Sequence, residues 1–240
     1  SIEDTVQHVK AIVATGQKAL KLDPWQPKHE EESNGYLTGK LSAEGERLGT
    51  ERVAAIREAV GPDIEVLIDC HGRFDVPTAI RLGKALEPYD IFWFEEPVSP
   101  DDYEGHARVA QSTIIPVATG ENEYTRYGFR DLIDHQSAAI LNADAQILGG
   151  ITEFMQVAAL AASHDLRIAP HGAQEIHIHL VSAISNGLIL EFYRETVDPL
   201  RGKVFKNPLT LDKDGYTTVP DAPGLGIEPD YEVLKPHRVG

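Results

Sequence analysis

The chain has 240 residues, of which 42% are hydrophobic, and a formal net charge of −16, so it can bury a sizeable core in one large domain or two small ones. The strong negative charge argues against nucleic acid or an anionic membrane surface as a partner, because both would repel the protein. No apolar run approaches the ~20 residues of a membrane span, and a single cysteine, Cys70, excludes an intramolecular disulfide, so a cytoplasmic location is expected.

Seven short apolar segments are predicted to be β-strands. Each is rich in apolar or β-branched residues and is bounded by polar or turn-forming ones. In chain order they cover residues 19–22, 65–69, 91–94, 115–119, 138–142, 166–169 and 188–191. Amphipathic segments between them predict helices, among them 75–86, with Asp75 as its N-cap, and 151–164. Strict alternation of strand and helix predicts an α/β fold with parallel strands.

The polar residues that end successive strands are regularly spaced. They are Asp69, Glu95, Glu121, Asp144, His171 and Glu191, at intervals of 26, 26, 23, 27 and 20 residues. This regularity favours a (β/α)8, TIM-like barrel over an open sheet, because a barrel brings all these strand ends to one mouth. Such a barrel has eight strands and seven are visible, so the first strand is expected to be missing at the N-terminus.

Two regions depart from this regular alternation. Residues 24–48 form a long polar insertion that is predicted to lie at the mouth of the barrel, with a plain surface loop as the alternative. From residue 196 the chain is rich in proline and glycine, and residues 209–219 predict a hairpin that turns at Asp214-Gly215. The predicted division is therefore a barrel domain over residues 1–195, incomplete at its N-terminus, and a C-terminal extension over residues 196–240.

Three carboxylates, Asp69, Glu95 and Glu121, end consecutive predicted units. Three such charges around one point would repel one another strongly unless a cation joined them. Mg²⁺ suits carboxylate ligands that leave positions open for water and substrate oxygens. The neighbouring Glu96 is predicted to point outward, because side chains alternate along a strand, and to pair with a cation or cap a backbone group.

The next two strand ends carry Asp144 and His171. A carboxylate beside an imidazole fixes its tautomer and raises the basicity of the other ring nitrogen. Alone the pair is a weak signal, because histidines near strand ends are often structural, but opposite a metal site it predicts a general base. The pair His177-x-His179 looks like a metal motif, yet it falls in a helix and is predicted to be structural.

Taken in order, these segments resemble the barrel domain of the enolase superfamily, in its mandelate racemase-like subgroup. The resemblance is carried by ALKLD (19–23), IDCHGRFDVPTAI (68–80), FWFEEPVSPDDYEGH (92–106), PVATGEN (116–122), LNADAQILGGITE (141–153), IAPHGAQE (168–175) and ILEFY (189–193). It implies that Asp69, Glu95 and Glu121 bind Mg²⁺. It also implies that the Asp144–His171 dyad removes the proton alpha to a carboxylate.

The same resemblance implies roles for two further strand-end residues. Glu191 matches an acid that hydrogen-bonds the substrate carboxylate or the enediolate, and Lys21 matches the first lysine of a Lys-x-Lys pair that helps to neutralise the substrate carboxylate. It also implies an α+β capping domain that selects the substrate, and this chain is expected to lack it.

Asp23 departs from the family pattern, since it stands where the second lysine of the pair is expected. A two-base racemase needs a base on each face of the alpha carbon, and here His171 is the one clear base. A one-base β-elimination is therefore favoured: Mg²⁺-dependent dehydration of an acid sugar to a 2-keto-3-deoxy acid. An epimerase or racemase, a lactone cycloisomerase and a non-catalytic barrel stay open as alternatives.

Three residues are predicted to contact the substrate, each with a structural alternative. Asp23 binds a sugar hydroxyl or starts the Asp-Pro turn. His71 contacts substrate or serves as an acid, or it makes a structural hydrogen bond. Arg73 meets an anionic group or forms a salt bridge at the rim. A small carboxylate substrate from sugar-acid catabolism and a homo-oligomeric state are expected, with no nucleic-acid or membrane partner.

Overall fold

A six-stranded parallel sheet forms the centre of the computed structural model, which describes residues 1–25 and 39–239. In the sheet order, the strands are β1 (Ala19–Leu22), β2 (Glu65–Asp69), β3 (Ile91–Glu95), β4 (Val117–Thr119), β5 (Ile140–Leu141) and β6 (Arg167–Ile168). The helices are α1 (Ile2–Val13), α2 (Ala43–Val60), α3 (Val76–Leu86), α4 (Tyr103–Ser112), α5 (Thr125–Asp134), α6 (Ile151–Ala162), α7 (Gln174–Ala183) and α8 (Tyr231–Leu234), with 3-10 turns η2 (Glu87–Tyr89) and η3 (Lys235–His237).

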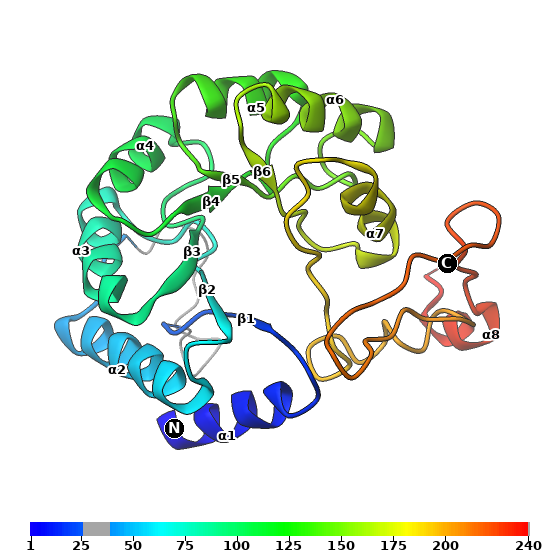
Figure 1. The fold of residues 1–240 in the computed structure, drawn as a ribbon, viewed down its shortest axis with the longest axis horizontal. Coiled ribbons are helices and arrows are strands. Elements are labelled where there is room, and N and C mark those ends of the chain that lie inside the picture. Colours follow the sequence, from blue (N-terminus) through cyan, green and yellow to red (C-terminus); the bar gives the residue numbers. More distant parts are fainter. Residues whose placement is uncertain (26–38, 240) are drawn as a thin grey trace.

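Figure 1 shows the strands curling around a common centre with α1 to α7 outside them. The predicted α/β fold with parallel strands is confirmed. None of the helices within the described ranges has the length and apolar character needed to span a membrane.

Local sequence explains where two of the helices begin. The Asp75 carboxylate accepts a hydrogen bond from the Thr78 N–H at the start of α3, as predicted for an N-cap. Ser42 caps α2 in the same way through the Gly45 N–H. Because α2 begins at Ala43, the insertion predicted over residues 24–48 ends earlier than expected. Its residues 26–38 lie outside the described part of the chain.

The inner face of the sheet carries an apolar layer. It is built by Ala19, Leu67, Trp93, Ala118, Ile140 and Ala169, together with Leu188 and Ile189. Side chains two positions further along a strand share the same face and lie nearer its C-terminal end. Those positions are Lys21, Asp69, Glu95, Asn142, His171 and Glu191. The apolar layer therefore forms the floor beneath the polar residues that the sequence singles out.

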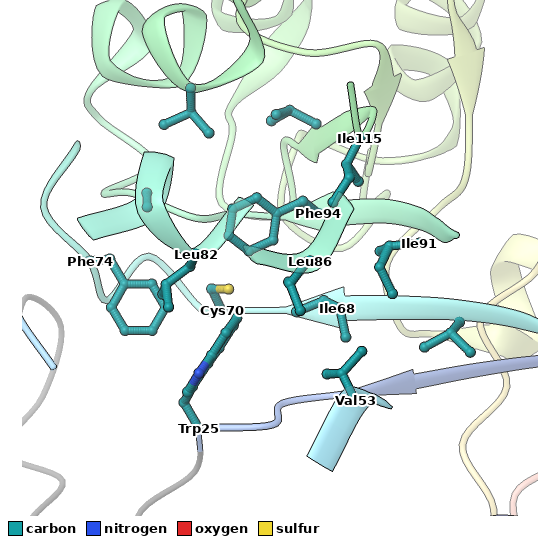
Figure 2. Packing of buried hydrophobic residues seen from close by; sticks show 14 of the residues in the cluster. Trp25, Val53, Ile68, Cys70, Phe74, Leu82, Leu86, Ile91, Phe94 and Ile115 are labelled. Carbon is teal, nitrogen blue, oxygen red and sulfur yellow. The ribbon is translucent and has the colours of Figure 1, made fainter. Parts of the chain in front are cut away.

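The outer face of the sheet packs against the helices. Figure 2 shows Ile68 of β2 and Phe94 of β3 buried among Val53 of α2 and Leu82 and Leu86 of α3. A second apolar cluster joins β5 and β6 to α5, α6 and α7. Burial of each large apolar side chain contributes about 1.5–3 kcal/mol, so these clusters fix the strand ends in place.

Residues 188–191, predicted to be a strand, are not one. This segment forms a single bridge with β6, between Gly187 and Ile168, with the Leu188 N–H donating to the Ile168 carbonyl at 2.8 Å. Within the described residues no strand pairs with its other side, so backbone hydrogen bonds join it to the sheet along one edge only. β1 likewise pairs with β2 alone. Within residues 1–25 and 39–239, no strand fills the opening between β1 and residues 187–191.

Contacts bridge this opening at both ends. Near the C-terminal end of the strands, Lys21 Nζ lies 2.6 Å from Glu191 Oε1. Near the other end, Arg194 Nη2 donates to Thr15 Oγ1 at 2.9 Å. The C-terminal extension also packs closely against the chain beside Thr15. A Cβ added at Gly16 would lie only 1.9 Å from the Lys213 carbonyl oxygen, so the two backbones approach each other directly there.

The C-terminal extension contains the predicted turn. The Asp212 N–H donates to the Tyr216 carbonyl at 2.7 Å and so closes a tight turn around Asp214 and Gly215. No strand is assigned on either side of this turn in the described chain. The division into a barrel domain and an extension at residue 196 stays a prediction.

Candidate active site

Three carboxylates converge at the C-terminal ends of β2, β3 and β4. One ligand oxygen from each of Asp69, Glu95 and Glu121 lies within 4.8 Å of the others. Asp69 and Glu95 are register partners in neighbouring strands, and Glu121 follows Gly120, whose φ of 126° turns the chain after β4. The structure thus brings the three predicted metal-binding residues together.

The electrostatics of this carboxylate cluster favour a bound cation. Burial raises the pKa of Glu95 to about 8, and the charges of Asp69, Glu191 and Glu121 act in the same direction. Burial also raises the pKa of Glu121, and one of its buried oxygens has no hydrogen-bond partner in the described part of the chain. Buried carboxylates are unfavourable unless a positive charge neutralises them. An all-oxygen donor set of this kind fits a hard divalent ion such as Mg²⁺.

Lys21 reaches the carboxylate cluster from β1. Its Nζ lies 3.0 Å from Asp69 Oδ2, 3.1 Å from Glu95 Oε1 and 2.6 Å from Glu191 Oε1. Burial lowers the pKa of the ammonium, but the charges of the three carboxylates outweigh burial and raise the pKa of Lys21 well above its ordinary value. Lys21 is therefore a fixed positive charge beside the cluster. The other oxygen of Glu191 accepts the Gly172 N–H at 2.6 Å, which ties this carboxylate to the loop that carries His171.

Asp144 and His171 form the predicted pair. Asp144 Oδ2 lies 3.0 Å from His171 Nδ1, and His171 Nε2 lies 3.8 Å from Glu121 Oε2. Burial lowers the pKa of His171, but the hydrogen bond with Asp144 and the charges of Glu121 and Glu191 outweigh it and raise the pKa to about 9. Nε2 of this strongly basic imidazole thus faces the carboxylate cluster, which is the position that a proton-transfer group requires.

Asp23 and Arg73 pair with each other beside Asp69. The buried Asp23 carboxylate accepts the Trp25 N–H at 2.9 Å and a hydrogen bond from Arg73 Nη2. Burial raises the pKa of Asp23, against the charge of Arg73. These contacts match the structural alternatives, a turn for Asp23 and a salt bridge for Arg73. A role in substrate binding stays a prediction for both residues.

His71 lies next to a different carboxylate of the cluster from His171. Its side chain is 51% exposed, with Nε2 at 3.6 Å from Asp69 Oδ2 and Nδ1 at 3.9 Å from Asp23 Oδ2. Both distances exceed hydrogen-bond length, so the imidazole of His71 forms no hydrogen bond with the carboxylate of Asp69 or with that of Asp23. One imidazole therefore lies beside Asp69 and the other beside Glu121.

Glu96 does not point away from the site, contrary to the prediction. Its φ of 39° departs from strand geometry and removes the expected alternation. The side chain is buried, and Oε1 accepts a hydrogen bond from Asn122 Nδ2 at 2.9 Å, in place of the predicted cation or backbone partner. Burial raises the pKa of Glu96 to about 8, and the charge of Glu121 adds to this effect.

Trp93 is a site residue that sequence reasoning missed. Its indole Nε1 donates to Glu95 Oε2 at 2.8 Å from within the apolar floor. Trp93 lies two residues before Glu95, so both side chains share the inner face of β3. This spacing is the sequence signal that could have identified Trp93.

A cavity of about 680 Å³ lies beneath the site, next to the opening between β1 and residues 187–194. Its walls combine the apolar floor residues Leu67 and Trp93 with Lys21, Glu95 and Glu191. The cavity thus reaches Glu95 of the carboxylate cluster, whereas Asp69, Glu121 and His171 do not line it.

Several known proteins are similar to this chain in sequence. A family model described as Enolase C-terminal domain-like matches residues 4–233. L-rhamnonate dehydratase of Saccharopolyspora erythraea is 34% identical over 220 residues, which are 85% of this chain and 56% of that protein. D-galactarolactone cycloisomerase of Agrobacterium fabrum is 38% identical over 200 residues, or 78% of this chain and 52% of that protein. The chain spans just over half the length of these curated relatives.

Solved structures of similar proteins superimpose over nearly the whole chain. L-talarate dehydratase from Polaromonas sp. JS666, complexed with Mg and L-glucarate, gives a TM-score of 0.81 at 31% identity and covers 98% of this chain, with 59% of its own chain matched. A member of the enolase superfamily from Salmonella Typhimurium gives a TM-score of 0.90 at 31% identity, over 98% of this chain and 61% of its own. These superpositions confirm the predicted barrel class.

Proposed function

Because this chain belongs to the Enolase C-terminal domain-like family, in the mandelate racemase and muconate lactonizing group of the enolase superfamily, we propose that it carries the catalytic site of a Mg²⁺-dependent acid-sugar dehydratase. The reaction removes the proton alpha to the substrate carboxylate and then eliminates water to give a 2-keto-3-deoxy acid. One observation carries the proposal: the Asp144–His171 pair faces a cluster of three carboxylates across 3.8 Å.

The carboxylate cluster is the proposed Mg²⁺ site. Asp69, Glu95 and Glu121 would hold the ion, which when bound supplies positive charge where the enediolate forms. The ammonium of Lys21 adds a second positive charge at the same place and binds the substrate carboxylate. Glu191, held by the Gly172 N–H, orients the same end of the substrate.

His171 is the proposed base. Its Nε2 takes the alpha proton, and the electron pair of the C–H bond moves into the carboxylate to form the enediolate. Asp144 accepts from Nδ1, keeps Nε2 free in the neutral ring and stabilises the imidazolium after proton transfer.

His71 is the proposed acid for the second step. The enediolate re-forms its carboxylate, the new C=C bond forms, and the bond from the beta carbon to its hydroxyl breaks as His71 protonates the leaving oxygen. Water leaves, and the resulting enol tautomerises to the 2-keto-3-deoxy acid. The half-exposed imidazole beside Asp69 supports this role, since the proposed base lies beside another carboxylate, Glu121.

The His171→Asn variant tests the base. Loss of the imidazole is expected to reduce keto-acid formation from a panel of acid sugars, and alpha-proton exchange in D2O, by about 10³-fold or more. NMR measures both rates in one sample with the full-length protein. Exchange at the wild-type rate in the variant would remove the dyad from the mechanism.

The His71→Asn variant separates the two steps. We expect it to retain alpha-proton exchange and to lose keto-acid formation by about 10²-fold. A matching loss of both rates would instead place His71 before the enediolate.

A lactone cycloisomerase through the same enediolate is the second candidate function. It is favoured by the similarity to D-galactarolactone cycloisomerase, at 38% identity. The same panel, extended with sugar lactones, distinguishes the two, because a cycloisomerase converts its substrate without releasing water. Conversion of a lactone with no keto acid formed would replace the dehydratase proposal.

A further inference from the structure

His177 of α7 joins the two loops that carry the Asp144–His171 pair. Its Nε2 lies 2.9 Å from the Ala145 backbone nitrogen, and its Nδ1 lies 2.7 Å from the Gly172 carbonyl oxygen. Ala145 directly follows Asp144, and Gly172 directly follows His171. One imidazole therefore spans the backbone of both catalytic loops.

The partners of His177 fix its tautomer. The Ala145 N–H can act as a donor alone, so Nε2 carries no proton, and the Gly172 carbonyl can act as an acceptor alone, so Nδ1 carries one. Burial lowers the pKa of His177, against the Gly172 carbonyl and the charge of Asp144, which favours the neutral ring. The ring is fully buried and stacks on Phe154, with centroids 5.9 Å apart and planes inclined by 27°.

The loop after His171 needs support of this kind. Gly172 and Ala173 both have left-handed backbone angles, with φ of 57° and 37°, and for alanine this conformation is strained. The Gly172 N–H is held by Glu191 Oε2 and the Gly172 carbonyl by His177 Nδ1. Without the imidazole, the Gly172 carbonyl and the Ala145 N–H would each lose a buried partner.

The ring of His177 also leaves Asp144 free for its own role. Nε2 lies 3.5 Å from Asp144 Oδ1, but both atoms are acceptors and form no hydrogen bond. Oδ1 instead accepts the Gln146 N–H at 2.8 Å, and Oδ2 remains for His171.

We propose that His177 is a positioning residue, which sets the distance and the ring orientation between Asp144 and His171. The inference deepens the proposed function, since it assigns a supporting residue to the same proton-transfer step. His177 acts through the two loop backbones and does not contact the reacting atoms.

The test compares His177→Phe with wild type and with the control His179→Phe. Phenylalanine keeps the ring and the stacking on Phe154 but removes both hydrogen bonds of His177. His179 lies two residues further along α7 and bonds the Leu225 carbonyl, away from the pair. The first readout needs no turnover: in protein labelled with ¹⁵N-histidine, NMR detects the His171 Nδ1 proton that is hydrogen-bonded to Asp144.

We expect this proton signal in wild type and in His179→Phe, and its loss in His177→Phe. The second readout is alpha-proton exchange, where kcat is expected to fall about 10- to 100-fold with little change in KM. A folded His177→Phe protein with the signal intact and kcat unchanged would overturn the proposal. If wild type shows the signal but no turnover, the proposed function fails and the signal still decides the role of His177.

A second variant covers the case in which His177→Phe does not fold. His177→Asn has a shorter side chain and can keep at most one of the two loop contacts. A weakened His171 signal with an intermediate kcat would support the positioning role. A wild-type signal with wild-type kcat would exclude it.

Discussion

A hydrogen bond from the apolar floor helps to orient one carboxylate of the cluster. This carboxylate is that of Glu95, since one of its oxygens accepts from Trp93 Nε1 and the other faces Lys21. Partners of this kind around metal ligands are a large part of metal affinity. The indole therefore belongs to the site although it lies in the apolar floor.

The Trp93→Phe variant is expected to weaken Mg²⁺ binding about 10-fold, because Glu95 loses the donor that fixes its carboxylate. Calorimetric titration with Mg²⁺ measures the change. Trp25→Phe is the matched control. Among the described residues the buried Trp25 indole N–H has no hydrogen-bond partner, and the ring packs on Phe74 with centroids 5.5 Å apart. Equal Mg²⁺ affinity in Trp93→Phe and wild type would show that the indole does not orient Glu95.

At the scale of elements, a glycine in α2 lets this helix approach Trp25. A Cβ added at Gly49 would lie 1.9 Å from Trp25 Nε1, and Trp25 is packed in turn against Phe74 and Phe94. The helix and the indole therefore interlock at this one position, which supports the outer side of β2 and β3.

Replacement of Gly49 by alanine is expected to reduce the free energy of unfolding by about 1–3 kcal/mol, as overpacking does in buried sites. Glycine to alanine inside a helix otherwise stabilises by up to ~1 kcal/mol. Gly83→Ala in α3 is the control, since its Cβ would meet Thr113 at an ordinary 3.4 Å. Denaturant unfolding compares the two variants, and a stabilised Gly49→Ala protein would contradict the interlocking.

At the scale of the whole molecule, the buried acids make stability depend on pH. The pKa of Glu95 and that of Glu96 are both raised to about 8, from an ordinary value of 4.5. Between these values the folded protein holds protons that the unfolded chain has released, so stability falls as pH rises through this range. The raised pKa of His171 acts in the same sense, because its stabilising contribution is lost as pH rises from 6.5 to about 9.

We therefore expect the Mg²⁺-free protein to melt several degrees lower at pH 8 than at pH 5. Saturating Mg²⁺ should reduce this difference, because it stabilises the ionised form of Glu95. Glu96→Gln should reduce the dependence in the metal-free protein, since the amide does not titrate. Thermal unfolding across the pH range measures all three, and a melting temperature that rises from pH 5 to pH 8 without metal would contradict the expected sign.

The sequence was enough to predict which residues lie at the site, but it did not correctly predict the direction of every side chain. Asp69 and Glu95 were found because each ends a buried strand, and strand ends in this fold meet at one edge. Glu96 was misjudged because one left-handed backbone angle overrides the alternation of the strand. The contacts of His177 were missed because they depend on how α7 packs over β5 and β6. Residues 188–191 have a strand-like pattern, but a strand also requires neighbours, which composition does not reveal.

Glu191 ties together two parts of the site that lie far apart in the chain. One of its oxygens lies 2.6 Å from Lys21 Nζ, and the other accepts the Gly172 N–H at 2.6 Å. A displacement of the backbone next to His171 would therefore also displace the carboxylate that neutralises Lys21. The proposed base and the proposed anchor for the substrate carboxylate are in this way held in register by one shared side chain.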